Sequence, residues 1–484
     1  MVSQENKFLL FRKYLTFSIG TWVSAVISFL FSPIVSWYIS PGEYGKWSMF
    51  WTVQGFLLTV VSLGLQNSLM RFYFEKSENE RPKLIFTAFM PTLVAWAVLS
   101  LLVVFFRTKI NIFILGEGSV PVYLWLIFSV LLGNVFSFVQ TILRINNKGI
   151  KYSFLQVTSV AFNLGFSVLF LTISYRDFRA LLYGGILGSF FATTLGIVMV
   201  SKAKILPHFD KQLFLELLHY GFPFIFASLL WWLLNWTDRL VLRFYTNFFE
   251  IGLYSAAFKL VQGMGIFTTG FSTLWYPFAY EQYEKNPNNK KVFSKVFDYV
   301  SFSMISMGLL FMLSKDIVFI LFSKTYRQAA AITPFLLLLP IMSTACVVVG
   351  RGIDFMKKTY WGIVIDGITF AFNLIGNLLL IPILGAKGAA LSTGLSFILF
   401  FFLESTVSMK LYPVDYKLKS FYAATSIFVF ASAINSFSVN KLINSVLTFV
   451  ALLVVIYIYF GIFSEVLNIA RDYLARKFGK FRKD

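Results

Sequence analysis

Apolar runs of about 20 residues recur along the whole 484-residue chain, and they constrain its fold more than any other feature. A helix of that length crosses the hydrocarbon core of a bilayer, which is about 30 Å thick. Because no water reaches the backbone inside lipid, helices that satisfy their own hydrogen bonds are the default there. A membrane barrel would instead show short alternating segments. The chain is therefore predicted to be an all-α polytopic membrane protein.

Composition excludes a water-soluble globule. Only 13% of the residues are charged and 58% are hydrophobic, with a mean hydropathy of +0.74, whereas a soluble domain carries about 25% charge. The net charge of +20 fits basic cytoplasmic loops better than nucleic-acid binding, because no polar domain is available to carry a nucleic acid. The single Cys346 excludes a disulfide framework.

The apolar runs predict about fourteen membrane-spanning helices. With the N-terminus inside, most of the 42 Lys and Arg residues fall in segments on the cytoplasmic side, which predicts that both termini are cytoplasmic. The first run is too long for the core of a signal peptide, so it is kept as the first span. The predicted spans are 14–39, 46–70, 85–106, 120–143, 153–174, 180–201, 218–240, 250–278, 296–314, 329–350, 360–382, 386–408, 419–437 and 442–464.

Short matches at a nearly constant offset indicate that one unit is used twice. Glu43-Tyr-Gly-Lys-Trp-Ser48 matches Glu250-Ile-Gly-Leu-Tyr-Ser255, and Ala161-Phe-Asn-Leu164 matches Ala371-Phe-Asn-Leu374. Because each copy holds six helices, the second enters the membrane from the same side, which makes a parallel repeat. Two such lobes facing each other would enclose a central cavity suited to alternating access. The predicted domains are an N-lobe (1–205), a C-lobe (206–410), two added helices (411–466) and a basic cytoplasmic tail (467–484).

Polar residues inside spans are costly and tend to face a cavity. Asp366, Asn373 and Asn377 share one helical stripe, and the first copy shows Gln156 and Asn163 at equivalent places. These stripes are expected to line the cavity, with Asp366 a candidate for binding a coupling proton or Na⁺. Polar contacts between packed helices are the alternative.

Cations inside or at the ends of spans are candidates for binding anions. Ser255, Lys259 and Gln262 form another stripe, and Lys259 lies roughly 13 Å along the helix from Glu250. In the first copy, Trp51 stands at the position of Lys259. Arg239, Arg71 and Arg351 lie near span ends, where they either anchor the helix or capture a phosphate-bearing headgroup. Asp238 beside Arg239 is interpreted as an interfacial ion pair.

The motifs of several enzyme classes are absent from the sequence. There is no Walker A pattern, no cluster of acids in a cytoplasmic loop and no large outside loop. No catalytic residue, metal site or cofactor is therefore predicted.

Several segments together resemble polysaccharide-exporting flippases, of the O-antigen type, in the multidrug/oligosaccharidyl-lipid/polysaccharide (MOP) superfamily. The resemblance covers nearly the whole chain. It lies in Ser40-Pro-Gly-Glu-Tyr-Gly45, Tyr220-Gly-Phe-Pro223, Thr237-Asp-Arg-Leu-Val241, Glu250–Lys259 and Leu380-Ile-Pro-Ile-Leu-Gly385 with Gly388-Ala-Ala390.

The resemblance implies transport of a polyprenyl-pyrophosphate-linked oligosaccharide to the outer leaflet of a bacterial cytoplasmic membrane. It implies a cationic cavity in which Lys259, Arg239 and Arg71 attract pyrophosphate or acidic sugars, with coupling to a proton or Na⁺ gradient. A glycan polymerase and chain-length proteins are further expected partners. A multidrug antiporter, a membrane glycan polymerase or ligase, and an assembly subunit remain the alternatives; short outside loops and the two added helices disfavour the first two.

Overall fold

The computed structural model describes residues 4–118, 120–201, 207–468 and 471, and every long regular element in these ranges is an α-helix. Most of the predicted basic tail, 467–484, lies outside the described residues. Within these ranges, twelve helices are long and apolar enough to cross a membrane, or thirteen if one bent pair counts as a span. The predicted helical membrane fold is confirmed.

The chain forms two compact units, whose division differs from the predicted domain boundaries. Unit 1 contains residues 1–259, 322–326 and 374–389, and unit 2 contains 260–321, 327–373 and 390–484. The division into lobes at 205 and 410 stays a prediction.

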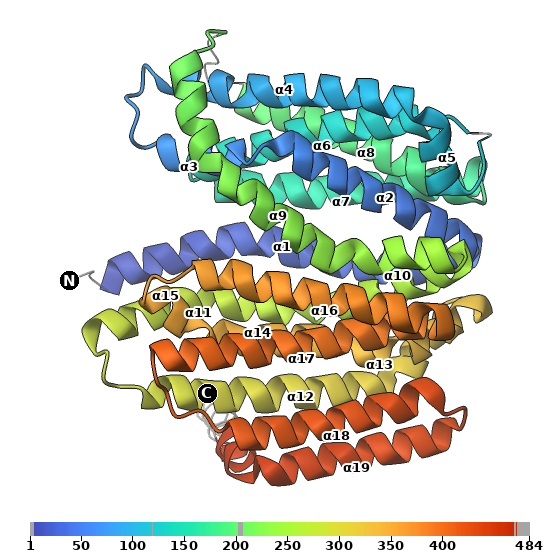
Figure 1. The fold of residues 1–484 in the computed structure, drawn as a ribbon, viewed down its shortest axis with the longest axis vertical. Coiled ribbons are helices and arrows are strands. Elements are labelled where there is room, and N and C mark those ends of the chain that lie inside the picture. The colour runs from blue at the N-terminus through green and yellow to red at the C-terminus, as the bar shows by residue number, and fades with distance from the viewer. Residues whose placement is uncertain (1–3, 119, 202–206, 469–470, 472–484) are drawn as a thin grey trace, which may run out of the picture. The chain divides into compact units, whose positions relative to one another are not determined.

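Unit 1 is built mainly from the first ten helices. Figure 1 shows α4, α6 and α8 running alongside one another, and α7 packs on α1 and α8. The helices are α1 (Gln4–Tyr38), α2 (Pro41–Ser62), α3 (Leu65–Phe72), α4 (Arg81–Phe105), α5 (Arg107–Leu115), α6 (Val122–Ile145), α7 (Gly149–Ile173), α8 (Phe178–Val200), α9 (Lys211–Tyr245) and most of α10 (Phe248–Gln262).

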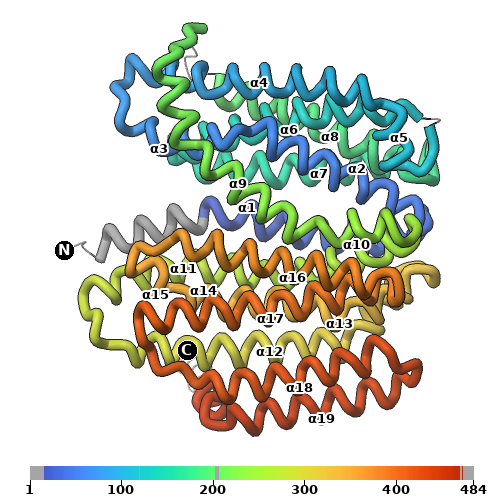
Figure 2. The backbone as a smooth tube through the Cα atoms, viewed as in Figure 1, coloured from blue at the N-terminus to red at the C-terminus, as the bar shows by residue number. Residues whose placement is uncertain are grey.

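Unit 2 is centred on α12, against which α14, α18 and α19 pack. Figure 2 shows α18 and α19 as an antiparallel hairpin. Its elements are α11 (Gly265–Lys285), α12 (Lys291–Ile320), most of the 3₁₀ helix η1 (Lys324–Ala331), α13 (Thr333–Leu336), α14 (Leu338–Val349), α15 (Arg351–Phe355), most of α16 (Tyr360–Leu384) and of α17 (Ala386–Leu411), α18 (Leu418–Phe437) and α19 (Lys441–Ile458).

Two predicted spans are broken rather than straight. The predicted span 46–70 is the bent pair α2 and α3, whose axes differ by 46°. At the bend Gly64 has φ of 67°, and a Cβ there would lie 2.2 Å from the carbonyl oxygen of Gly221, so both its conformation and its packing require glycine. The predicted span 250–278 is divided into α10 and α11, and Gly263 and Gly265 flank the break, in keeping with the low helix propensity of glycine.

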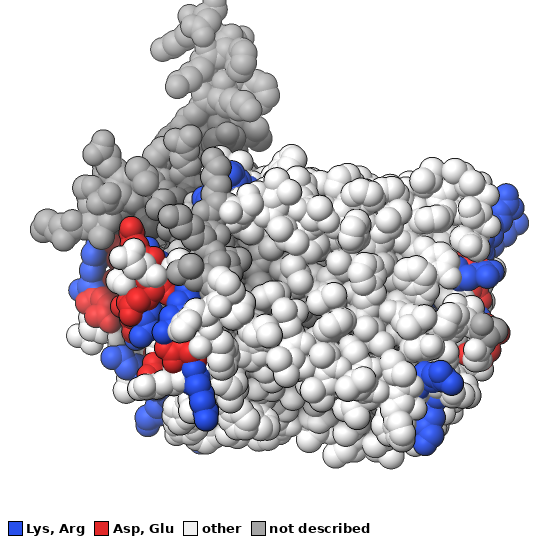
Figure 3. Space-filling view, turned by 90° about the horizontal axis from the view of Figure 1, so that it is seen from above, with Lys and Arg blue, Asp and Glu red and all other residues white. Residues whose placement is uncertain are grey.

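The distribution of charge fits a protein that crosses a bilayer. On the face drawn in Figure 3, charged residues gather at two ends and leave a broad uncharged band between them. On α19 the side chains of Leu442, Val446, Phe449 and Tyr457 are exposed, as expected for a helix that faces lipid.

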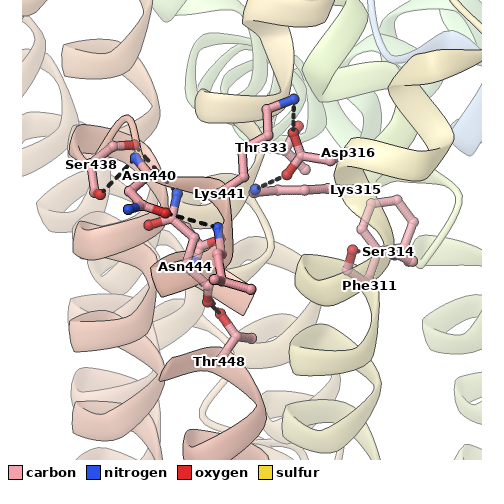
Figure 4. A network of polar contacts seen from close by, with 12 residues as sticks. Phe311, Ser314, Lys315, Asp316, Thr333, Ser438, Asn440, Lys441, Asn444 and Thr448 are labelled. Atoms are coloured by element: carbon pink, nitrogen blue, oxygen red, sulfur yellow. Dashed lines mark hydrogen bonds and ion pairs between the residues drawn. The ribbon is translucent and has the colours of Figure 1, made fainter. Parts of the chain in front are cut away.

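Ionic contacts hold the added helices to α12 in unit 2. Near the end of α12, Asp316 accepts from the buried Lys315 at 2.7 Å and pairs with Lys441 of α19 at 3.2 Å (Figure 4). Towards the beginning of the same helix, the buried Asp298 pairs with Lys417 at 3.1 Å. These two pairs lie at opposite ends of the α18–α19 hairpin and fix its register on α12.

Candidate functional site

In unit 1, helices α2 and α10 touch at equivalent positions of the sequence repeat. A Cβ added to Gly45 would lie 2.0 Å from the carbonyl oxygen of Phe248, and one added to Gly252 would lie 1.8 Å from that of Pro41. Only glycine permits this approach. One turn further, the equivalent residues Ser48 and Ser255 hydrogen-bond to each other at 2.7 Å and are both buried.

The two repeated glutamates perform the same task in the two copies. Glu43 accepts a hydrogen bond at 3.1 Å from the backbone N–H of Phe178, the first residue of α8. Glu250 accepts one at 2.9 Å from the backbone N–H of Ala386, the first residue of α17. Each carboxylate thus lies at a helix N-terminus, where unpaired N–H groups and the helix dipole favour negative charge.

Arg239 of α9 is buried beside this crossing, although the sequence suggested a position at the membrane interface. Its Nε donates to Ser255 Oγ at 3.2 Å and its Nη1 to the carbonyl oxygen of Asn235 at 3.1 Å. The guanidinium carbon also lies 4.5 Å from the Trp236 ring centroid and 4.6 Å from that of Phe258. Arg239 therefore places a positive charge inside unit 1 and positions Ser255.

Asp238, the neighbour of Arg239, is 1% exposed and belongs to a buried polar cluster. One carboxylate oxygen accepts from Asn377 Nδ2 at 2.6 Å, and the other accepts from the hydroxyl of Tyr254. Asp238 and Asn377 are far apart in the sequence, so no local sequence pattern predicts this contact. Oxygen atoms of this kind are ligands suited to a hard cation.

Lys259 of α10 faces an aromatic ring rather than an acid. Its Nζ lies 5.8 Å from the ring centroid of Trp47, a residue of α2. The side chain is half-buried, and within the described ranges it makes no ion pair. Gln262, predicted on the same stripe, is exposed.

Gln156 and Asn163, which belong to the polar stripe of α7, each contact a neighbouring helix. Gln156 bridges neighbouring groups: its Oε1 accepts from Thr21 of α1 at 3.0 Å, and its Nε2 donates to the Tyr152 hydroxyl at 3.1 Å. Asn163 accepts from Ser189 of α8 at 3.3 Å. Both residues thus make contacts to a neighbouring helix, and the lining of a cavity by this stripe stays a prediction.

In unit 2, the predicted residues of α16 and α15 have different surroundings. Asn373 donates to Thr393 at 3.4 Å. Asp366 is half-buried and makes no hydrogen bond or ion pair within the described ranges. Arg351 pairs with Asp354 on the same turn, and its guanidinium lies 4.4 Å from the Tyr276 ring centroid.

Sequence analysis missed Glu404 of α17, whose carboxylate oxygen would lie 1.9 Å from a Cβ added to Gly350. Glu404 lies close enough to Arg351 and Asp366 to interact electrostatically with both. A signal was present in the sequence, since Glu404 is an acid inside a predicted apolar span, as Asp366 is.

Arg71, at the end of α3, stands apart from these groups. It is exposed and pairs at 2.5 Å with Glu75, four residues further along the chain. Its guanidinium thus already has an acidic partner close by in the sequence, as that of Arg351 does. Of the four predicted cations, Arg239 and Lys259 are the two that lie beside the α2–α10 crossing.

Where α4 and α9 begin, unit 1 has a cavity of about 240 Å³ lined by charges of both signs. Within it, Asp210 caps α9 by accepting from the Leu213 N–H at 3.0 Å and pairs with Lys83 at 2.7 Å. The hydrogen bond from Lys83, together with the backbone donor, lowers the pKa of Asp210 to about 2. The lining residues are Lys76, Glu80, Lys83, Asp210, Gln212, Leu213 and Glu216.

Comparison with known proteins gives consistent results. The sequence profile of a family described as "Polysaccharide biosynthesis protein" matches residues 10–283. A probable low-salt glycan biosynthesis flippase, Agl15 of Haloferax volcanii, is 21% identical over 365 residues, which are 74% of this chain and 75% of that protein.

Solved structures share the fold. The lipid II flippase MurJ in an inward closed conformation superposes with a TM-score of 0.72 at 18% identity, over 94% of this chain and 99% of MurJ. A mutant of the Vibrio cholerae MATE transporter VcmN superposes with a TM-score of 0.55 at 14% identity, over 84% of this chain and 98% of VcmN.

Proposed function

The chain belongs to the polysaccharide biosynthesis protein family, and from this membership we propose that it is a flippase for a lipid-linked oligosaccharide. The substrate would be a polyprenyl-pyrophosphate-linked repeat unit, moved from the cytoplasmic to the outer leaflet of a bacterial cytoplasmic membrane. The observation that carries the proposal is the family match over residues 10–283, which includes both helices of the α2–α10 crossing. The glycan flippase of Haloferax volcanii supports the same class of function.

Transport of this kind requires no covalent step by the chain itself. A sugar and a pyrophosphate need polar and positive surroundings to cross a bilayer, because each charge or hydroxyl left without a partner in lipid is costly. Lys259 and Arg239 supply the positive charge in this proposal. Arg71 and Arg351 contribute less, since each guanidinium already pairs with an acid close by in the sequence.

Coupling to a proton or Na⁺ gradient is part of the proposal, with a buried carboxylate as the ion carrier. Asp366 remains the sequence-based candidate for this role, and Asp238 joins it because its oxygens lie in a buried polar cluster. Both would act by binding the ion in one conformation more tightly than in another.

The test is the leaflet location of lipid-linked glycan in a strain that lacks the gene, complemented with wild type, Lys259→Ala or Asp366→Asn. Intermediates that accumulate on the cytoplasmic side, with full restoration by wild type alone, are the expected result. The fold shared with VcmN gives the alternative of a multidrug antiporter. Normal glycan export with changed sensitivity to cationic drugs would establish that alternative and reject the flippase.

A further inference from the structure

Two tryptophans of α2 form a partly exposed aromatic surface in unit 1. Trp47 and Trp51 are four residues apart, so they lie on the same side of the helix. Their ring centroids are 6.4 Å apart and the ring planes meet at 71°. Both side chains are half-buried, which leaves part of their surface available for contact.

Neighbouring residues fix the orientation of both rings. Tyr44 lies 5.0 Å from Trp47 between centroids, and Phe50 lies 5.4 Å from Trp51 in an edge-to-face arrangement. On the α8 side, a Cβ added to Gly185 would lie 3.2 Å from Cζ2 of Trp51. The rings are thus held by aromatic packing and by close approach to a residue that has no side chain.

Polar groups border this surface on two sides. The same added Cβ at Gly185 would lie 3.6 Å from Oδ1 of Asn163, so Trp51 and Asn163 border one residue. Lys259 Nζ lies over Trp47 and has no carboxylate partner in the described ranges. A cation in a membrane span without an anion is a functional candidate by default.

The indole N–H groups of Trp47 and Trp51 add a further observation. Both nitrogens are closed to solvent and lack an acceptor within the part of the chain that the structure describes. A buried donor without an acceptor is unfavourable. A change of conformation that uncovered these nitrogens would let a ligand hydroxyl accept from them and relieve that cost.

We propose that Trp51 stacks on one sugar ring of the transported glycan, that Trp47 contacts the edge of that ring, and that Lys259 binds an anionic group next to it. The C–H faces of a pyranose carry partial positive charge and match the negative face of an indole ring. A few placed polar groups then set orientation, here Asn163 and Lys259. Because an ammonium is a point charge, it accepts a carboxylate or a phosphate alike.

This assignment rests on the proposed function and sharpens it to glycans with acidic sugars. The test uses the full chain in proteoliposomes and two synthetic polyprenyl-pyrophosphate-linked disaccharides, one ending in glucuronic acid and one in glucose. The wild-type chain is expected to flip the acidic glycan about tenfold faster or more, the effect of one charge-assisted hydrogen bond.

Variants separate the parts of the proposed site. In Lys259→Met the ratio of the two rates is expected to fall to near one. Trp47→Leu and Trp51→Leu are each expected to slow both glycans about tenfold, whereas Trp231→Leu, which changes an exposed tryptophan of α9, keeps the wild-type rates. Thermal unfolding of each variant, together with Trp51→Phe, distinguishes lost stacking from lost folding.

Each possible result of the transport assay tests one part of the proposal. If the wild-type chain flips neither glycan, the proposed function itself fails. If it flips both at equal rates, the function stands and the acidic-sugar assignment is wrong. If Lys259→Met slows both glycans equally, Lys259 binds the shared pyrophosphate instead. If Trp51→Leu behaves as Trp231→Leu does, the stacking surface is rejected.

Discussion

Helices α2 and α10 carry the same framework and differ in one functional position. Both present a glycine at the crossing, a serine one turn later and a glutamate that caps a distant helix. A further turn along, at the same offset of 207 residues, α2 has Trp51 and Thr52 where α10 has Phe258 and Lys259. The residues that repeat are those that hold the backbones together. The positions that diverge place an aromatic ring on α2 and a cation on α10, next to the same framework.

The largest expected effect tests whether the crossing needs both glycines. Gly45→Ala and Gly252→Ala each place a Cβ within about 2 Å of a backbone oxygen, and neither oxygen can move without displacing its helix. Each variant should lower the free energy of unfolding by about 3 kcal/mol or more, measured by thermal denaturation of the purified chain. Gly165→Ala is the matched control, because nothing lies within 4 Å of its added Cβ. If Gly252→Ala were as stable as wild type, the two copies would not share the need for glycine at the crossing.

Removing the two serine hydroxyls should reduce stability by different amounts, although Ser48 and Ser255 occupy equivalent positions. Ser255 bonds both Ser48 and the buried Arg239, so Ser255→Ala leaves a charged donor without its partner and should cost about 1.5–3 kcal/mol. Ser48→Ala removes one neutral hydrogen bond and should cost about 1 kcal/mol. Denaturation of the two variants side by side checks the difference, and equal losses would show that Arg239 finds another acceptor.

Removing either glutamate carboxylate should reduce stability by nearly the same amount. Glu43→Ala and Glu250→Ala each remove an acceptor from a helix N-terminus, which typically costs about 1 kcal/mol. Similar reductions in the melting temperature are expected for both. If one variant melts as wild type does, the two copies do not share this function.

The smallest expected effect concerns Asp210, which caps the first helix of the second copy. Its pKa of about 2 lies below the unfolded value of about 3.9, so its stabilisation is present above pH about 4 and is lost as the pH falls towards 2. Asp210→Asn should therefore melt slightly below wild type at pH 7, and the difference should vanish near pH 2. A difference that persists at pH 2 would assign the effect to packing rather than to charge.

The fold was accessible from the sequence because hydrophobic length and repetition are local or regular signals. Apolar runs located the helices, and the Glu43 and Glu250 segments disclosed the repeat. The sequence did not predict the breaks near Gly64 and Gly263. Glycine is tolerated in membrane helices, so its presence alone does not predict a bend.

Long-range contacts account for most of what remained hidden in the site. Asp238 meets Asn377 across 139 residues of chain, and no periodicity links them. Arg239 was placed at an interface because it ends an apolar run, yet the structure buries it against aromatic rings. In the sequence, Trp47 and Trp51 do not differ from other aromatic residues of a membrane protein. Only the structure shows that Lys259 lies over the Trp47 ring.

The contact between Ser48 and Ser255 has the geometry of an isologous pair, in which the same surface is present on both sides. Each six-helix copy therefore contributes the same half of the contact, and that surface is complementary to itself. Two identical copies could form it without any added interaction, as subunits of a homodimer do. In this respect the covalent link between the copies is not needed to specify the crossing.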